Sequence, residues 1–249
     1  MNATSEQLSP REVAGEMWRV YRRRWTFLVP AAIVVLLPQS IADALVEGFH
    51  VDHLRSATDV ATFGAALLIA AVNLLGQAVY AGLTAAAVVD WRAGLPLPPL
   101  SDLLRAMPLG RLILLDVVIT LGWAIGVLLL VIPGLIFLTY VAISPAVLKL
   151  EHLGVGESVR RSIGLVRGQA RRVFVIVVGV VLVTEAAVQL VAIPFDNFAV
   201  LTVVNLLAEG VFQPIEGLAV ALVAIHLLEL RGEAAEPSTM ARALVTEDH

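Results

Sequence analysis

The sequence predicts an all-α polytopic membrane protein with about six transmembrane helices, arranged as three hairpins that each follow a short amphipathic interfacial helix. Hydrophobic residues make up 59% of the chain and charged residues only 15%, and the mean hydropathy is +0.88. A soluble fold of this size needs more polar residues for its surface. The cations are also sorted: of 17 Lys and Arg residues, only Arg55 falls in a connection expected outside. Because Lys and Arg hold loops in the cytoplasm, both termini are expected inside.

Six apolar runs approach or exceed the roughly 20 residues that a spanning helix needs. They cover residues 26–46, 60–89, 112–132, 135–150, 173–195 and 199–230. The runs are continuous, which favours helices over the alternating strands of a barrel. The predicted division is a cytoplasmic amphipathic helix over 1–24, a six-helix transmembrane domain over 25–231 and a disordered cytoplasmic tail over 232–249.

A short amphipathic stretch precedes each pair of runs. The first begins at Ser9-Pro10, a capping serine followed by a proline suited to the first helical position. Similar stretches begin near Ser101 and Val155, each with apolar residues on one face and arginines on the other. The sixteen arginines and one lysine are typical of a high-GC bacterial genome, so the expected location is a bacterial inner membrane.

Two details of the runs predict helix ends. Pro133-Gly134 is expected to make a tight turn between the third and fourth runs near the outer face. The sixth run is too long for one untilted span at about 1.5 Å per residue. Residues 199–208 are therefore expected to form an outer-surface helix or an upper extension, with the span itself near 211–230.

One stretch of the chain, best defined over 130–180, carries a family resemblance. Its residues are Pro133-Gly134, Pro145, Glu151, Arg161-Ser162, Leu165, Arg167-Gly168 and Arg171-Arg172. This pattern resembles the membrane domain attached to some bacterial glycerophosphoryl diester phosphodiesterases and the stand-alone six-span membrane proteins related to it. The end departs from that pattern, with His226, Glu229 and Arg231 where aromatic residues and an aspartate are usual. The phosphodiesterase barrel is absent, so the resemblance implies the accessory membrane part without the enzyme.

Polar residues inside the runs are candidates for a functional path, because each ionisable group costs about 2.5–3.5 kcal/mol at mid-membrane. The candidates are Asn73, Gln77, Glu185, Gln189, Glu209, Gln213 and Glu216. They predict either a polar path through spans two, five and six or a set of interhelical hydrogen bonds. Asp116 lies five residues beyond Arg111, and we expect it to reach the inner headgroups.

The arginines of the inner segments are candidates for binding lipid headgroups, although topology alone also accounts for them. The candidates are Arg22, Arg23, Arg24, Arg105, Arg111, Arg160, Arg161, Arg167, Arg171 and Arg172. The expected partners are the lipid bilayer, its anionic phospholipids and other membrane proteins.

The sequence lacks the motifs of common enzymes. It has no Cys, no nucleophile elbow, no zinc-protease motif and no phosphate loop. Neither a cofactor, a metal nor a nucleic acid is expected. The predicted function is that of a non-enzymatic integral membrane protein, an accessory or scaffold that contacts anionic phospholipid or partner proteins. The alternative is a small transporter or lipid-handling protein that uses the polar path.

Overall fold

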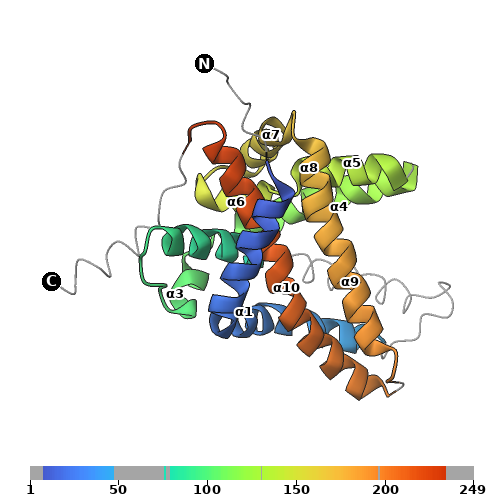
Figure 1. Ribbon diagram of the computed structural model, residues 1–249. Helices are drawn as coiled ribbons and strands as arrows, with labels where there is room; N and C mark the ends of the chain where they lie inside the picture. Colours follow the sequence, from blue (N-terminus) through green and yellow to red (C-terminus); the bar gives the residue numbers. More distant parts are fainter. Residues whose placement is uncertain (1–7, 48–75, 77–78, 130, 196, 234–249) are drawn as a thin grey trace.

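The computed structural model describes residues 8–47, 76, 79–129, 131–195 and 197–233, which are helical with short connections and contain no strand. The helices are α1 (Pro10–Glu47), an unlabelled helix over 79–92, α3 (Leu100–Arg105), α4 (Leu109–Leu129), α5 (Val131–Val141), α6 (Ser144–Leu150), α7 (Val155–Val166), α8 (Ala170–Val173), the π-helical segment η1 (Phe174–Val178), α9 (Gly179–Ala192) and α10 (Phe198–Glu229). Figure 1 shows their arrangement.

Three stretches of the described chain are long and apolar enough to cross a membrane. They are Ile132–Leu150, Ala170–Ala192 and Val200–Glu229. The second is mostly unburied and exposes large apolar side chains such as Leu182, Val183 and Leu190. Such a surface suits contact with lipid rather than water. The fold is therefore all-helical in its described part and compatible with a membrane protein.

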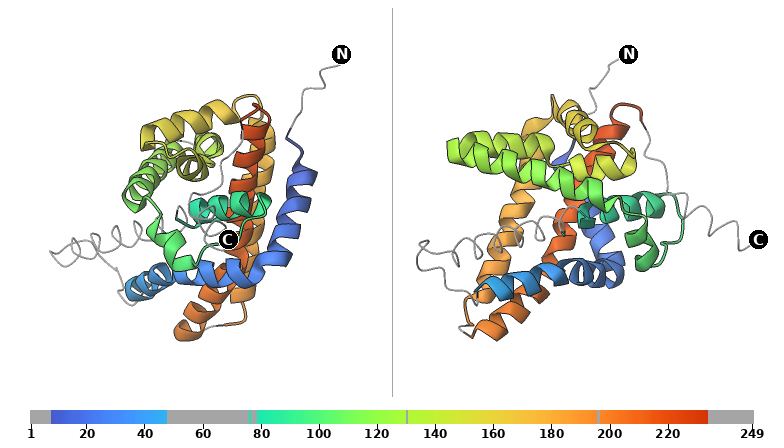
Figure 2. Two further views of the ribbon diagram at one scale, coloured as in Figure 1. Left: turned by 90° about the vertical axis from the view of Figure 1, so that its left-hand side faces the viewer. Right: turned by 180° about the vertical axis from the view of Figure 1, so that it is seen from behind.

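Helix α1 joins the predicted interfacial helix and the first apolar run in one continuous helix. The segment across residue 24 has neither Gly nor Pro, so nothing there interrupts the backbone hydrogen bonds. Pro30 and Pro38 lie inside α1, and Figure 2 shows that the helix changes direction along its length. Interior prolines are the usual cause of such bends.

The main core forms where α1, α6, α7, η1 and the helix over 79–92 meet α10. Helix α1 packs along α10, and α9 also lies beside α10 (Figures 1 and 2). Leu218 and Leu222 of α10 are fully buried in this cluster. The connection between α9 and α10 lies at the lower right of Figure 1, far from the end where α1 begins.

The two expected helix ends have different outcomes in the structure. Pro133-Gly134 does not form the turn, because α5 begins at Val131 and contains both residues. Proline is tolerated there, since backbone N–H groups in the first turn of a helix lack intrahelical partners. Residues 199–208 extend the last helix at its N-terminal end and do not form a separate surface helix, and α10 passes Pro214 without a break. The predicted tail lies, from residue 234 onward, outside the described residues.

Candidate functional site

An ionic cluster around Arg92 connects three helices at the charged end of the molecule. Arg92 binds Glu16 of α1, with Nε donating to Oε1 at 2.9 Å and Nη2 to Oε2 at 2.8 Å. Its Nη1 donates to Oε1 of Glu229 in α10 at 2.7 Å. His226 Nε2 lies 3.5 Å from Glu16 Oε2. In the sequence Arg92 counts only among the cations that predict the topology, and the acids within the basic segments are the signal that could have indicated its ion pairs.

A second ionic cluster joins α7 to the segments after α6 and α10. Arg161 donates from Nε and Nη2 to Glu151 at 2.9–3.1 Å, a bidentate pair with about a quarter of each side chain exposed. Arg161 also pairs with Glu233. The neighbouring Ser162 donates to the carbonyl oxygen of Tyr140 at 2.7 Å. Arg161, a predicted headgroup contact, is thus engaged within the protein.

The other predicted headgroup arginines fall into two groups. Arg24 lies over the Trp91 ring at 5.6 Å, Arg105 is 3.6 Å from Asp102, and Arg172 donates to Gln169 at 2.8 Å. The second group is exposed and forms no ion pair with another described residue. Its members are Arg22, Arg23, Arg111, Arg160, Arg167 and Arg171. These six are free to meet an anionic surface.

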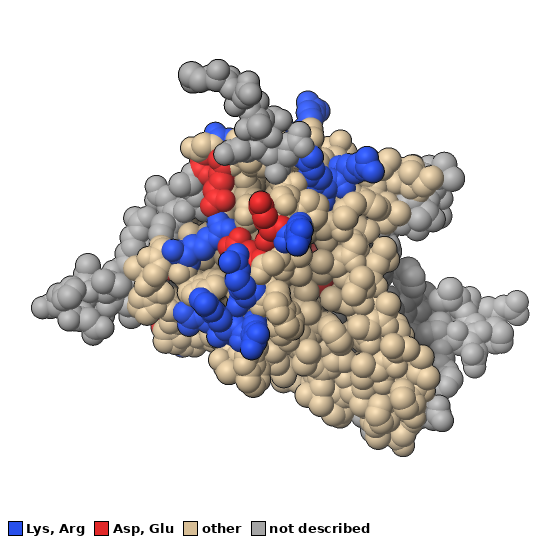
Figure 3. All heavy atoms as spheres, viewed as in Figure 1, with Lys and Arg blue, Asp and Glu red and all other residues tan. Residues whose placement is uncertain are grey.

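Charged residues gather at one end of the visible face. In Figure 3 the Lys, Arg, Asp and Glu side chains lie over the upper and left parts, and the lower right part is formed by other residues. The connection between α9 and α10 lies towards this uncharged part (Figure 1). The charge distribution along the helices is therefore strongly one-sided, as in a protein with one face at a membrane surface.

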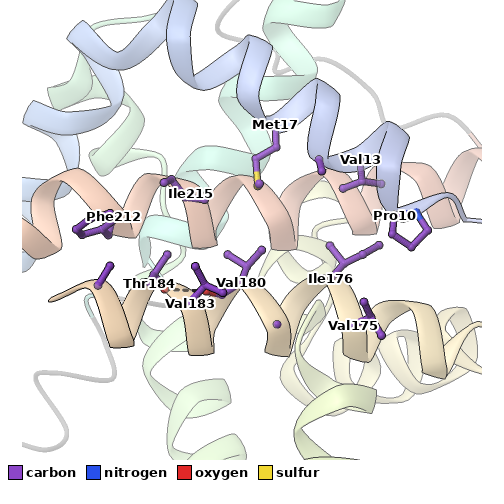
Figure 4. Close-up of a pocket in the computed structure, with 13 residues that line it drawn as sticks. Pro10, Val13, Met17, Val175, Ile176, Val180, Val183, Thr184, Phe212 and Ile215 are labelled. Carbon is purple, nitrogen blue, oxygen red and sulfur yellow. Dashed lines mark hydrogen bonds between the residues drawn. The ribbon is translucent and has the colours of Figure 1, made fainter. Parts of the chain in front are cut away.

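An apolar groove of about 480 Å³ lies between α1, α10 and the continuous helix of η1 and α9. We define this apolar groove by Pro10, Met17, Val175, Gly179 and Phe212, which line it together with further apolar residues. Figure 4 shows Pro10 and Val175 at one end and Phe212 at the other. Along η1 and α9 the lining extends from Val175 to Ala187. These positions are twelve residues apart, which gives the groove a length of about 18 Å at 1.5 Å per residue.

A smaller polar pocket of about 150 Å³ lies where residues of the helix over 79–92, α4, α5, α6, η1, α9 and α10 converge. We define this polar pocket by its three oxygen-bearing side chains, Asp116, Gln213 and Glu216. Asp116 is only 8% exposed, and its Oδ2 has no hydrogen-bond partner among the described residues. Thr184 Oγ1 donates to Glu216 Oε1. The expectation that Asp116 reaches the headgroups is wrong, because the packing of α4 turns it inward.

The predicted polar path is only partly assembled. Gln213 and Glu216 line the polar pocket, whereas Glu185 and Gln189 are exposed on α9. Glu209 of α10 does not appear in the described lining of the polar pocket. The remaining two candidates, Asn73 and Gln77, lie outside the described residues. Within the described part, no group of three or more His, Asp or Glu side chains is placed to hold a metal ion.

Comparison with protein-family models, curated proteins and solved structures finds no match for this chain. The resemblance to the phosphodiesterase membrane domain therefore stays a prediction. The structure gives its motif residues local roles: Glu151 and Arg161 form the second ionic cluster, and Ser162 fixes α7 against the end of α5. These contacts hold α7 against the neighbouring segments.

Proposed function

We propose that the protein is a non-enzymatic six-span protein of the bacterial inner membrane, with both termini cytoplasmic, that holds anionic phospholipid as an accessory or scaffold. The observation that carries this proposal is the apolar groove, which has exposed cations beside one end. Three candidate spans, the one-sided charge and the six exposed arginines support the same reading.

The dimensions of the groove suit an acyl chain. Thr184 supplies the only side-chain oxygen in its described lining, and Thr184 already donates to Glu216. The groove is about 18 Å long, similar to the depth of one leaflet, which is about half of a hydrocarbon core roughly 30 Å thick. A chain lying in it would bury methylene groups at about 0.8 kcal/mol each, relative to water.

Cations border the end where the lipid phosphate would lie. Arg11 directly follows Pro10, and Arg171 precedes Val175 by four residues, so it lies on the same helix side one turn before the groove. Both arginines are exposed. Guanidinium groups bind phosphate oxygens through strong charge-assisted hydrogen bonds. The groove wall also includes the π-helical η1, a rare geometry that is frequent at functional sites.

The test measures lipid retained by the purified protein. Gly179 lines the groove, and a Cβ at this position would meet no atom within 4 Å, so Gly179→Leu places a larger side chain at the groove wall from an open position. The protein is equilibrated with vesicles that contain equal amounts of phosphatidylglycerol and phosphatidylcholine, and bound lipid is measured by native mass spectrometry. We expect Gly179→Leu to retain lipid about tenfold more weakly than the wild type, which is equivalent to losing roughly two buried methylene groups. The matched control is Gly110→Leu in α4, another open position outside the groove. Equal retention by both variants and the wild type would contradict the proposal.

Headgroup selection is tested with Arg11→Gln combined with Arg171→Gln. Each cation near an anionic surface contributes about 1 kcal/mol, so the preference for phosphatidylglycerol should fall roughly tenfold or more while total retention persists. Arg22→Gln with Arg23→Gln removes the same charge from positions that do not line the groove. A preference that survives the first pair, or is lost equally with the second, would argue against a bound headgroup at the groove.

The second candidate function is the small transporter or lipid-handling protein. The polar pocket favours it, because Asp116 and Glu216 come from distant parts of the chain and meet at one cavity. Glu185 and Gln189 argue against a continuous path through this cavity, since both are exposed on α9. The polar pocket thus supports a binding site more directly than a channel.

A further inference from the structure

We propose that the polar pocket binds a small organic cation with an ammonium group and a short apolar chain. This rests on the second candidate function and is independent of the apolar groove. The pocket brings Asp116 of α4 together with Gln213 and Glu216 of α10, whereas no Lys or Arg appears in its described lining. Two carboxyl groups that line one pocket favour a positively charged occupant.

The unsatisfied oxygen of Asp116 indicates that the occupant donates hydrogen bonds. Asp116 is more than nine-tenths buried and lines the pocket, yet its Oδ2 has no partner in the described structure. Buried polar atoms are nearly always paired, because leaving one unpaired costs free energy. A primary ammonium carries three N–H donors, enough for both carboxyl groups and the Gln213 amide oxygen.

The walls distinguish an organic cation from a metal ion. Calcium requires six to eight oxygen ligands and magnesium a nearly ideal octahedron. Only three side chains in the described lining carry oxygen, and the other side chains are Ala, Val, Leu, Ile and Pro. Ile119, Leu138 and Val181 supply the apolar surface that a short carbon chain needs. Small-molecule sites typically combine such walls with few polar groups.

The experiment uses isothermal titration of the full-length protein in detergent with n-butylammonium, and with 1-butanol as the uncharged analogue. We expect saturable binding of butylammonium and at least about tenfold weaker binding of butanol, because hydrogen bonds to charged groups are the stronger ones. Absence of butylammonium binding, or equal binding of butanol, overturns the proposal. Neither result bears on lipid retention at the groove, so the two proposals fail separately.

Matched variants locate the site. Asp116→Asn and Glu216→Gln keep the side-chain shape and should each weaken butylammonium binding about tenfold. Glu12→Gln removes an exposed carboxylate outside the pocket lining and should change nothing. If Asp116→Asn does not purify as a folded protein, Glu216→Gln decides alone. Wild-type affinity in Glu216→Gln, or an equal loss in Glu12→Gln, overturns the assignment to this pocket.

Discussion

At the scale of single residues, the neighbours Arg160 and Arg161 show how similar positions in a basic segment acquire different roles. Arg161 is bidentate to Glu151 and also pairs with Glu233, whereas Arg160 is exposed. A single step along α7 separates a structural cation from a cation available to lipid. The sequence predicts both as headgroup contacts, because nothing in the local pattern tells which face of α7 will pack.

Replacing Arg161 should destabilise the protein more than replacing Arg160. Arg161→Ala leaves the partly buried Glu151 without its partner. The free energy of unfolding should fall by about 1–2 kcal/mol, a cost between that of losing an exposed pair and the 3–5 kcal/mol of breaking a fully buried one. Arg160→Ala should stay within about 0.5 kcal/mol of wild type. Thermal unfolding in detergent measures both. Equal melting temperatures would show that the Glu151 pair adds no stability.

Asp116 marks the limit of residue-level prediction. The sequence identifies an acid in an apolar run but cannot say which neighbours enclose it. Its pocket partners Gln213 and Glu216 lie about 100 positions away. Both partners can be recognised as candidates in the sequence, because a polar residue within an apolar run raises the free energy of membrane insertion. Their grouping with Asp116 depends on the packing of α4 and α10 around one cavity.

At the scale of elements, a close crossing holds the helix over 79–92 against α10. A Cβ on Gly217 would lie 2.9 Å from both Thr84 Oγ1 and the Tyr80 ring. Tyr80 is fully buried, and its hydroxyl donates to the carbonyl oxygen of Leu28 in α1 at 2.9 Å. Three helices therefore pack closely at this point because Gly217 has no side chain. Close packing at small residues is common between membrane helices.

Gly217→Ala should weaken this crossing although alanine is the better helix former. The added methyl group has to displace the Tyr80 ring, and such overpacking costs about 1–3 kcal/mol. Gly110→Ala meets no atom within 4 Å and should be neutral or stabilising by up to about 1 kcal/mol. The measurement is the detergent-solubilised melting temperature of each variant. A Gly217→Ala protein as stable as Gly110→Ala would rule out a tight crossing.

Hydropathy predicts that helices exist but places their ends less well. The last two predicted runs correspond to η1 with α9 and to α10. The turn expected at Pro133-Gly134 is wrong, since proline is compatible with the first turn of a helix as well as with a loop. The continuity of α1 past residue 24 escapes prediction because a change from polar to apolar residues marks a change of environment and leaves the backbone free to continue.

At the scale of the whole molecule, charge and apolar surface are separated along the helices. The ionic clusters of Arg92 and Arg161 and the exposed arginines lie on segments that the sequence assigns to the cytoplasm. The opposite end, where α9 turns into α10, has no Lys or Arg between Val173 and Leu230. This separation underlies the proposed orientation, the cationic end of the groove and the access of inner-leaflet lipid.

The most direct test of this orientation is labelling of single cysteines with a membrane-impermeant maleimide in right-side-out vesicles. The chain has no Cys, so Gly15→Cys, Gly156→Cys and Phe195→Cys each carry one thiol at an exposed site. Six spans with inner termini predict labelling at 195 only, with 15 and 156 reacting once the vesicles are opened. Labelling of 15 without 156, or 156 without 15, in sealed vesicles would require an odd number of spans between them and would contradict the proposed topology.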